Sequence, residues 1–155
     1  MATGLGYVAD LVPTAFTNVA STIFQMTASA ACPFSIHRLE LQSNETGSTQ
    51  TVLQVQAIIA TSTGSGGTTT SITPHAIVQK NTTASATTCV SGYTTPGATT
   101  TVLHTWQWNG ATPFDIVLGK DVMVFEIPAS KIFALNFIAA PGTPTISGSI
   151  TFEEM

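Results

Sequence analysis

Three histidines, His37, His75 and His104, are the side chains of this sequence best suited to bind a metal ion or to carry a proton. Zinc sites in proteins place their ligands at short, recurring spacings such as H-x-x-x-H and C-x-x-C, and the histidines here follow none of them. We therefore expect no metal site and no cofactor. His104 lies between apolar neighbours, so we interpret it as an interior or interface histidine with a satisfied ring.

Carboxylates are the next candidates for chemistry. Asp115, Asp121 and Glu126 fall near the ends of predicted strands, and a glycosidase would need two such groups on either side of the scissile bond. Solvated carboxylates in turns are the more common case. Glu153 and Glu154 are most simply a solubilising tail. The pattern of these carboxylates indicates no particular substrate, and we predict that the protein is not an enzyme.

A glycine- and threonine-rich stretch, "STGSGGTTTSITPH" at residues 62–75, has the composition of a loop that cradles phosphate. A Walker A loop requires a lysine after its last glycine, and here Gly67 is followed by three threonines. The dinucleotide fingerprint and the G-x-S-x-G elbow of serine hydrolases are also missing. The stretch therefore predicts a long loop within one β domain, of the kind that binds a partner or moves.

The two tryptophans, Trp106 and Trp108, are two residues apart, so on a strand both rings point to the same face. Such a surface would fill the core, stack on a sugar, or be buried against another subunit. Interfaces favour tryptophan, and we assign both residues to a subunit or capsid interface as one of these three possibilities.

Charge is scarce in this chain of 155 residues: charged residues make up 8%, hydrophobic residues make up 43%, and the net charge is −4. So few charges provide little repulsion between free monomers, which indicates a protein that lives in an assembly. The four basic residues are scattered along the chain, and we expect no nucleic-acid binding. No apolar run is long enough for a membrane span and no signal peptide is evident, so we expect synthesis in the cytoplasm and no membrane partner.

Alternating apolar and polar residues predict β-strands along most of the chain. "TISGSITF" places Ile146, Ile150 and Phe152 on one side, and similar patterns occur at 14–20, 21–27, 33–42, 50–61, 101–109, 113–118, 121–127 and 131–139. The apolar parity shifts within "FSIHRLEL", which predicts a β-bulge near His37 and Arg38. Strands without helices to cover them favour an all-β, antiparallel two-sheet sandwich of jelly-roll type with about eight strands.

We predict a single sandwich domain over residues 14–155, preceded by an N-terminal arm at 1–13. The arm contains the apolar segment "GLGYVADLVP", and we expect Tyr7 and Leu11 to contact the capsid or a neighbouring subunit. Two cysteines do not make a disulfide framework in a chain of this length. We interpret Cys32 and Cys89 as buried free thiols, with a single bridge between them as the alternative.

Several stretches, in the order in which they occur, carry a resemblance to a known family. They are "IHRLEL" (36–41), "TSTGSGGTTTSITPHAI" (61–77), "WQWNGATPF" (106–114), "PASKIFALNFIAAP" (128–141) and "ISGSITFEE" (146–154). From residue 15 onward the chain resembles small all-β virion proteins of tailed bacteriophages, in particular the jelly-roll cement or decoration proteins on the outside of the icosahedral head. The shared motifs are structural, and no catalytic residues come with the resemblance.

The resemblance implies a non-enzymatic virion protein that binds the major capsid protein as a homotrimer on the outer capsid surface. There it would stabilise contacts between capsomers after the shell expands. Two other functions remain open. One is a carbohydrate- or receptor-binding module of a phage tail, with Trp106, Trp108 or Tyr93 as a stacking platform. The other is a small jelly-roll capsid subunit, although the scarcity of basic residues argues against that.

Overall fold

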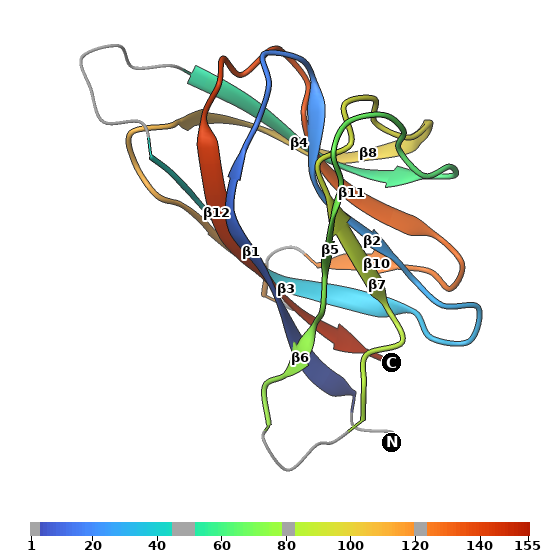
Figure 1. The fold of residues 1–155 in the computed structure, drawn as a ribbon. Helices are drawn as coiled ribbons and strands as arrows, with labels where there is room; N and C mark the ends of the chain where they lie inside the picture. Colours follow the sequence, from blue (N-terminus) through green and yellow to red (C-terminus); the bar gives the residue numbers. More distant parts are fainter. Residues whose placement is uncertain (1–3, 45–51, 79–82, 120–123) are drawn as a thin grey trace.

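The computed structural model describes residues 4–44, 52–78, 83–119 and 124–155, which form twelve β-strands and no helix. All strand pairs are antiparallel, and they build two six-stranded sheets (Figure 1). The first sheet has the order β10-β3-β12-β1-β6, with β9 also paired to β3. Its strands are β1 (Leu5–Ala15), β3 (Phe34–Ser43), β6 (His75–Ala76), β9 (Phe114–Val117), β10 (Phe125–Ile127) and β12 (Thr145–Glu154).

The second sheet has the order β5-β7-β2-β11-β4-β8. Its strands are β2 (Ser21–Thr27), β4 (Val52–Ala60), β5 (Thr70–Ile72), β7 (Thr88–Ser91), β8 (Thr99–Asn109) and β11 (Ile132–Phe137). None of these six strands contains Asp, Glu, Lys or Arg, so we call it the uncharged sheet. The first sheet is the charged sheet because its strands carry Asp10, Arg38, Glu40, Asp115, Glu126, Glu153 and Glu154.

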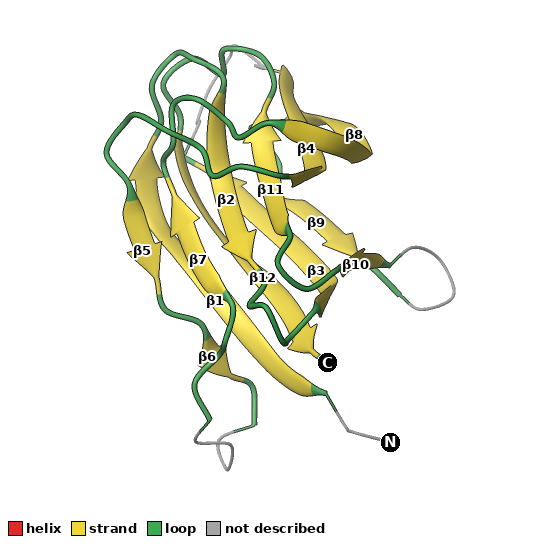
Figure 2. Ribbon diagram, turned by 90° about the vertical axis from the view of Figure 1, so that its right-hand side faces the viewer, coloured by secondary structure: helices red, strands yellow, loops and turns green. Residues whose placement is uncertain are grey.

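The core lies between the two sheets, which form two layers in Figure 2. Side chains of both sheets meet in one hydrophobic cluster, and its largest members are aromatic. Phe152 of the charged sheet stacks on Tyr7, with ring centroids 5.6 Å apart. From the uncharged sheet Phe133 packs against Phe125, with ring centroids 6.3 Å apart. The prediction of an all-β, antiparallel, two-sheet protein is confirmed.

The strand predictions match the structure best where alternation is strict. The run at 21–27 is β2, and in β12 the predicted face of Ile146, Ile150 and Phe152 is buried. The strand expected at 14–20 is wrong, because β1 ends at Ala15 and the chain then turns into β2. The short strands β5, β6 and β7 were not expected, since strands of two to four residues are too short to show a period.

The predicted bulge near His37 and Arg38 is present. Thr151 of β12 lies opposite Arg38, whereas the next residue, Phe152, lies opposite Ile36. His37 is therefore the extra residue of β3, and it returns both ends of the strand to the same core-facing side.

The expectation of an N-terminal arm outside the sandwich at residues 1–13 is wrong for residues 5–13, because they belong to β1. This strand begins at Leu5 and pairs with β12 from Leu5↔Glu154 to Ala15↔Thr145, which places it inside the charged sheet. Its alternate side chains, Tyr7, Ala9 and Leu11, are buried in the core. Residues 5–13 thus belong to the sandwich, because a paired strand buries one of its two faces. Residues 1–3 lie outside the described ranges.

The stretch at 62–75 contains β5 and the first residue of β6, so it is not a loop throughout. Before β5, the segment 61–69 lies against the outer face of the uncharged sheet. The buried Gly64 donates its N–H to the side-chain oxygen of Gln25 on β2 (2.9 Å), and Ser65 exchanges backbone hydrogen bonds with Thr95. A second apolar cluster is buried on that outer face, and it consists of Ile58, Ala60, Ile132 and Ala134.

Both cysteines are free, as predicted. Cys89 is buried, and burial raises the pKa of its thiol to about 12. Cys32 is only half-buried, so the prediction of burial is confirmed for Cys89 alone.

Candidate functional site

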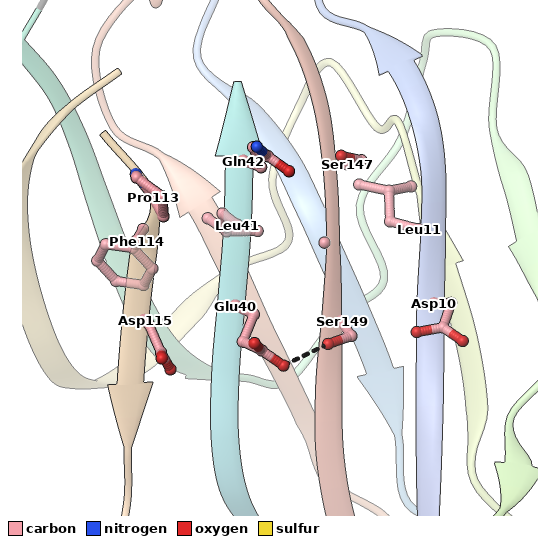
Figure 3. A pocket seen from close by; sticks show the side chains of 11 residues that line it. Asp10, Leu11, Glu40, Leu41, Gln42, Pro113, Phe114, Asp115, Ser147 and Ser149 are labelled. Atoms are coloured by element: carbon pink, nitrogen blue, oxygen red, sulfur yellow. Dashed lines mark hydrogen bonds between the residues drawn. The ribbon is translucent and has the colours of Figure 1, made fainter. Parts of the chain in front are cut away.

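A hollow of about 450 Å³ on the outer face of the charged sheet is the first candidate site (Figure 3). It lies across four neighbouring strands. Strand register lines up one outward side chain from each of them: Asp10 on β1 is opposite Ser149 on β12, Ser149 is opposite Glu40 on β3, and Glu40 is opposite Asp115 on β9. Alternate residues of a strand share a face, so this row is a direct product of pairing.

Hydrogen bonds hold the middle of this row in place. Ser149 donates its hydroxyl to Glu40, with the two oxygen atoms 3.0 Å apart. Arg38 bridges two carboxylates of the row, because its guanidinium binds both oxygens of Asp115 at 2.9 and 2.8 Å and lies 3.0 Å from Glu40. Asp10, at the other end, lies 3.4 Å from the ring of His75.

The Arg38 guanidinium also sets the protonation of its partner. Its hydrogen bond holds the pKa of Asp115 below the usual range, and Asp115 in turn raises the pKa of Arg38. A carboxylate held ionised by a bound guanidinium is a poor proton donor near neutral pH, which argues against Asp115 as a catalytic acid. Within the described residues, no group of three or more His, Cys, Asp or Glu is placed to hold a metal ion.

The other predicted carboxylates are separated from this row. Glu126 lies on β10, opposite Ser35 of β3, and Asp121 lies outside the described residues. Glu154, expected in a solubilising tail, is buried with an exposure of 7%. Its carboxylate accepts hydrogen bonds from the Ser85 hydroxyl at 2.6 Å and from the Thr87 N–H at 2.8 Å. It therefore anchors the chain before β7, and this corrects the expectation.

Three of the four predicted interface residues lie in the core. Tyr7 is fully buried, and Leu11 and Trp108 are each 3% exposed. The Trp108 ring nitrogen donates to the Thr112 carbonyl at 2.6 Å, so its polar group is satisfied within the chain. These three side chains have almost no surface left for a partner or a sugar, because both parent strands direct them between the sheets.

Trp106, the fourth predicted interface residue, is only partly buried. Its ring packs against Phe114, with centroids 5.5 Å apart, and against Phe125 at 6.2 Å. The ring of the exposed His104 lies over it, with a centroid separation of 4.6 Å. Trp106 and Trp108 share one face of β8, as predicted, and the structure shows that it is the inner face, which His104 also occupies. Val102 lies on the outer face, because the bulge at Leu103 shifts the register, and it is 52% exposed.

Sequence reasoning did not find the row of Asp10, Glu40 and Ser149. Each of them is a polar residue at an outward position of a strand, so alternation shows which face it occupies. The neighbour of each residue in the next strand depends on register, which alternation does not contain.

Comparison of the chain with protein-family models, with curated proteins and with solved structures gives no match. Among the described residues, no helix is long and apolar enough to cross a membrane.

Proposed function

We propose that this protein is a non-enzymatic virion component that binds the outside of a bacteriophage head as a homotrimer. Its role is to add contacts between capsomers of the expanded shell. The proposal begins with the resemblance of the chain to phage decoration proteins, and it draws support from strand order and from the distribution of charge.

We propose further that the sandwich is a jelly roll. The support is the path of the longer strands between the two sheets. In the charged sheet β1, β12 and β3 are adjacent, with β9 and β10 on the far side of β3; in the uncharged sheet β2, β11, β4 and β8 are adjacent. The strands β1 to β4 alternate between the sheets, and β8 to β12 return alongside them, which is the path of two Greek keys. On this assignment β5, β6 and β7 form an insertion between β4 and β8.

The observation that carries the functional proposal is the separation of charge between the two sheets. The charged sheet turns Asp10, Arg38, Glu40 and Asp115 toward its outer surface, while the strands of the uncharged sheet expose threonine, glutamine and valine. Charged groups are costly to bury and are depleted in the cores of protein interfaces. The uncharged sheet is therefore the side suited to contact the shell, and the charged sheet is the side suited to water.

Bridging neighbouring subunits stabilises a shell by mass action, because each bound trimer adds interface area that must be broken before the subunits separate. This mechanism needs a rigid body present in many copies and needs no catalytic group. A two-sheet sandwich with one continuous hydrophobic core supplies that rigidity.

Native mass spectrometry and rebinding to phage heads stripped of decoration protein test the proposal. We expect a mass near three times 16.1 kDa, or near a whole multiple of that trimer mass, and saturable binding to expanded heads. Gln54→Lys, on the outer face of the uncharged sheet, should lower occupancy, whereas Gln42→Lys, on the outer face of the charged sheet, should not. Both glutamines are exposed residues of a strand, so the pair is matched. A monomer that fails to bind heads would overturn the proposal.

A further inference from the structure

Three of the four sheet edges in the described part of the chain are short. The charged sheet ends in the two-residue β6 on one side and in β9 and β10, of four and three residues, on the other. The uncharged sheet ends in the three-residue β5 and in β8, which has eleven residues. Proteins commonly protect their edges by keeping edge strands short or by placing charges and prolines in them. β1 extends well past the two residues that pair with β6, but it carries Asp10 and Pro13. β8 has no charged residue and no proline, so in these ranges it is the one long edge strand without such protection.

The unpaired backbone groups of β8 can be assigned from its neighbour. The Gln54 carbonyl on β4 accepts a hydrogen bond from the Ile138 N–H at 3.1 Å, so Gln54 directs its backbone groups toward β11 and away from β8. In an antiparallel pair, the residue of β8 opposite such a residue of β4 directs its own N–H and C=O away from β4 as well. Gln107 lies opposite Gln54, and Thr105 lies opposite Gln56 in the same phase. The N–H and C=O of Thr105 and Gln107 therefore point outward from the sheet edge.

The register of β8 is regular in this part of the strand. From His104 to Asn109 it pairs without interruption with β4, and its bulges lie nearer its beginning, beside Ile58 to Ala60. The segment that carries the outward groups of Thr105 and Gln107 therefore retains the straight geometry that a further strand needs.

The absence of charge indicates which partner fits. When a strand pairs antiparallel with a copy of itself, a two-fold axis brings side chains of the same strand close together, so any charged residue would face like charge. β8 contains no Asp, Glu, Lys or Arg, and the adjacent outer positions Gln54 and Gln56 are uncharged too. An edge of this composition is complementary to itself.

We propose that β8 pairs antiparallel with β8 of a second copy of this chain, through the backbone groups of Thr105 and Gln107. The two uncharged sheets then join into one continuous sheet. The pairing also covers the edge where the partly buried Trp106 and the exposed His104 lie. The contact is independent of the capsid proposal, and with a trimeric ring it would link two trimers.

Proline substitutions test this pairing directly. Thr105→Pro and Gln107→Pro remove an outward N–H without breaking a backbone hydrogen bond to β4, and edge strands tolerate proline at such positions. Thr105→Pro also loses the hydrogen bond from the Gln56 side chain to the Thr105 hydroxyl, and the control Thr105→Val loses the same bond. We expect each variant to weaken self-association about tenfold or more in sedimentation velocity, which corresponds to about 1.4 kcal/mol. The matched controls Thr105→Val and Gln107→Ala keep the N–H and should associate like the wild type. Thermal unfolding shows whether each variant remains folded.

A second pair of variants keeps the test sound if proline disturbs the strand. Gln107→Lys and Gln107→Glu should each associate more weakly alone at low salt, and an equimolar mixture of the two should associate more strongly than either, because opposite charges then meet across the axis. Amide hydrogen exchange at Thr105 and Gln107 should slow as the wild-type concentration rises.

The results separate this proposal from the capsid proposal. A folded proline variant that still associates like the wild type places the contact elsewhere and overturns the pairing. Fast exchange at Thr105 and Gln107 at every concentration does the same, even where a trimer forms and binds heads. Loss of an even-numbered assembly to a trimer in the proline variants supports the pairing and leaves the trimer intact.

Discussion

Glu154 lies near the end of the chain, yet its carboxylate is buried and hydrogen-bonded. Burial alone would raise the pKa of its carboxyl, but hydrogen bonds from Ser85, Thr87 and Ala86 outweigh that effect, and its pKa is lowered. The neighbouring Glu153 points to the other face of β12, where it lies 3.3 Å from the His37 ring. Two adjacent glutamates thus have different roles because a strand alternates its faces.

Glu154→Gln tests the anchor at residues 85–87. We expect it to lower the free energy of unfolding near pH 7 by about 2 kcal/mol, the scale of hydrogen bonds to a charged group. Because the folded state lowers the pKa below its ordinary value of 4.5, the ionised carboxylate stabilises the fold above that pH and ceases to do so as the pH falls through the folded pKa. The difference from wild type in urea unfolding should therefore shrink in acid.

Glu153→Gln is the control for this change, since its carboxylate is on the outer face and 38% exposed. It should alter the free energy of unfolding by less than about 0.5 kcal/mol. Equal losses in the two variants, or a Glu154→Gln effect that does not change with pH, would contradict the anchor.

At the scale of elements, the segment 61–69 has a structural role that its composition does not suggest. Its glycines allow a close approach to the segment 92–98, and Thr61 and Ser65 both form backbone hydrogen bonds with it. A Cβ atom at Gly64 would lie 2.7 Å from the Cγ and 2.8 Å from the Cβ of Tyr93. The glycine-rich composition therefore serves packing against the uncharged sheet.

Gly64→Ala should destabilise the fold by about 1 to 3 kcal/mol, because the Tyr93 ring base cannot move aside without shifting its own backbone. The measurement is the midpoint and slope of chemical unfolding. Gly119→Ala is the matched control, since nothing lies within 4 Å of a Cβ placed there. A Gly64→Ala variant as stable as Gly119→Ala would contradict this, because it would show that the segment 61–69 can move away from Tyr93 without loss of stability.

At the scale of the whole molecule, the first and last strands are part of one sheet. Leu5 lies opposite Glu154, so the first and last strands pair along most of their length, and the start of β1 and the end of β12 lie at the same end of the sandwich (Figures 1 and 2). β1 also separates β12 from β6 and supplies Tyr7, Ala9 and Leu11 to the core. Without β1, both the charged sheet and the hydrophobic core would be incomplete.

Deletion of residues 1–13 should leave a chain that does not fold cooperatively, because it removes most of β1 and exposes the edge of β12. Circular dichroism with thermal unfolding provides the measurement. Deletion of residues 1–3, which precede β1, is the control and should keep the transition. If the chain that lacks residues 1–13 unfolds at the wild-type temperature, those residues are a separable arm after all.

Local alternation was enough to predict the antiparallel sandwich, the buried face of β12 and the bulge at His37, since a period of two records which side of a strand faces the core. It did not predict the burial of Tyr7 and Leu11 within β1. It also did not predict the joining of Asp10, Ser149, Glu40 and Asp115 into one row. Those outcomes depend on which strands pair and in what register, and the pairing partners are far apart in the chain. Long-range pairing, bulges and the burial of one face select that register together, so no short stretch of residues contains it.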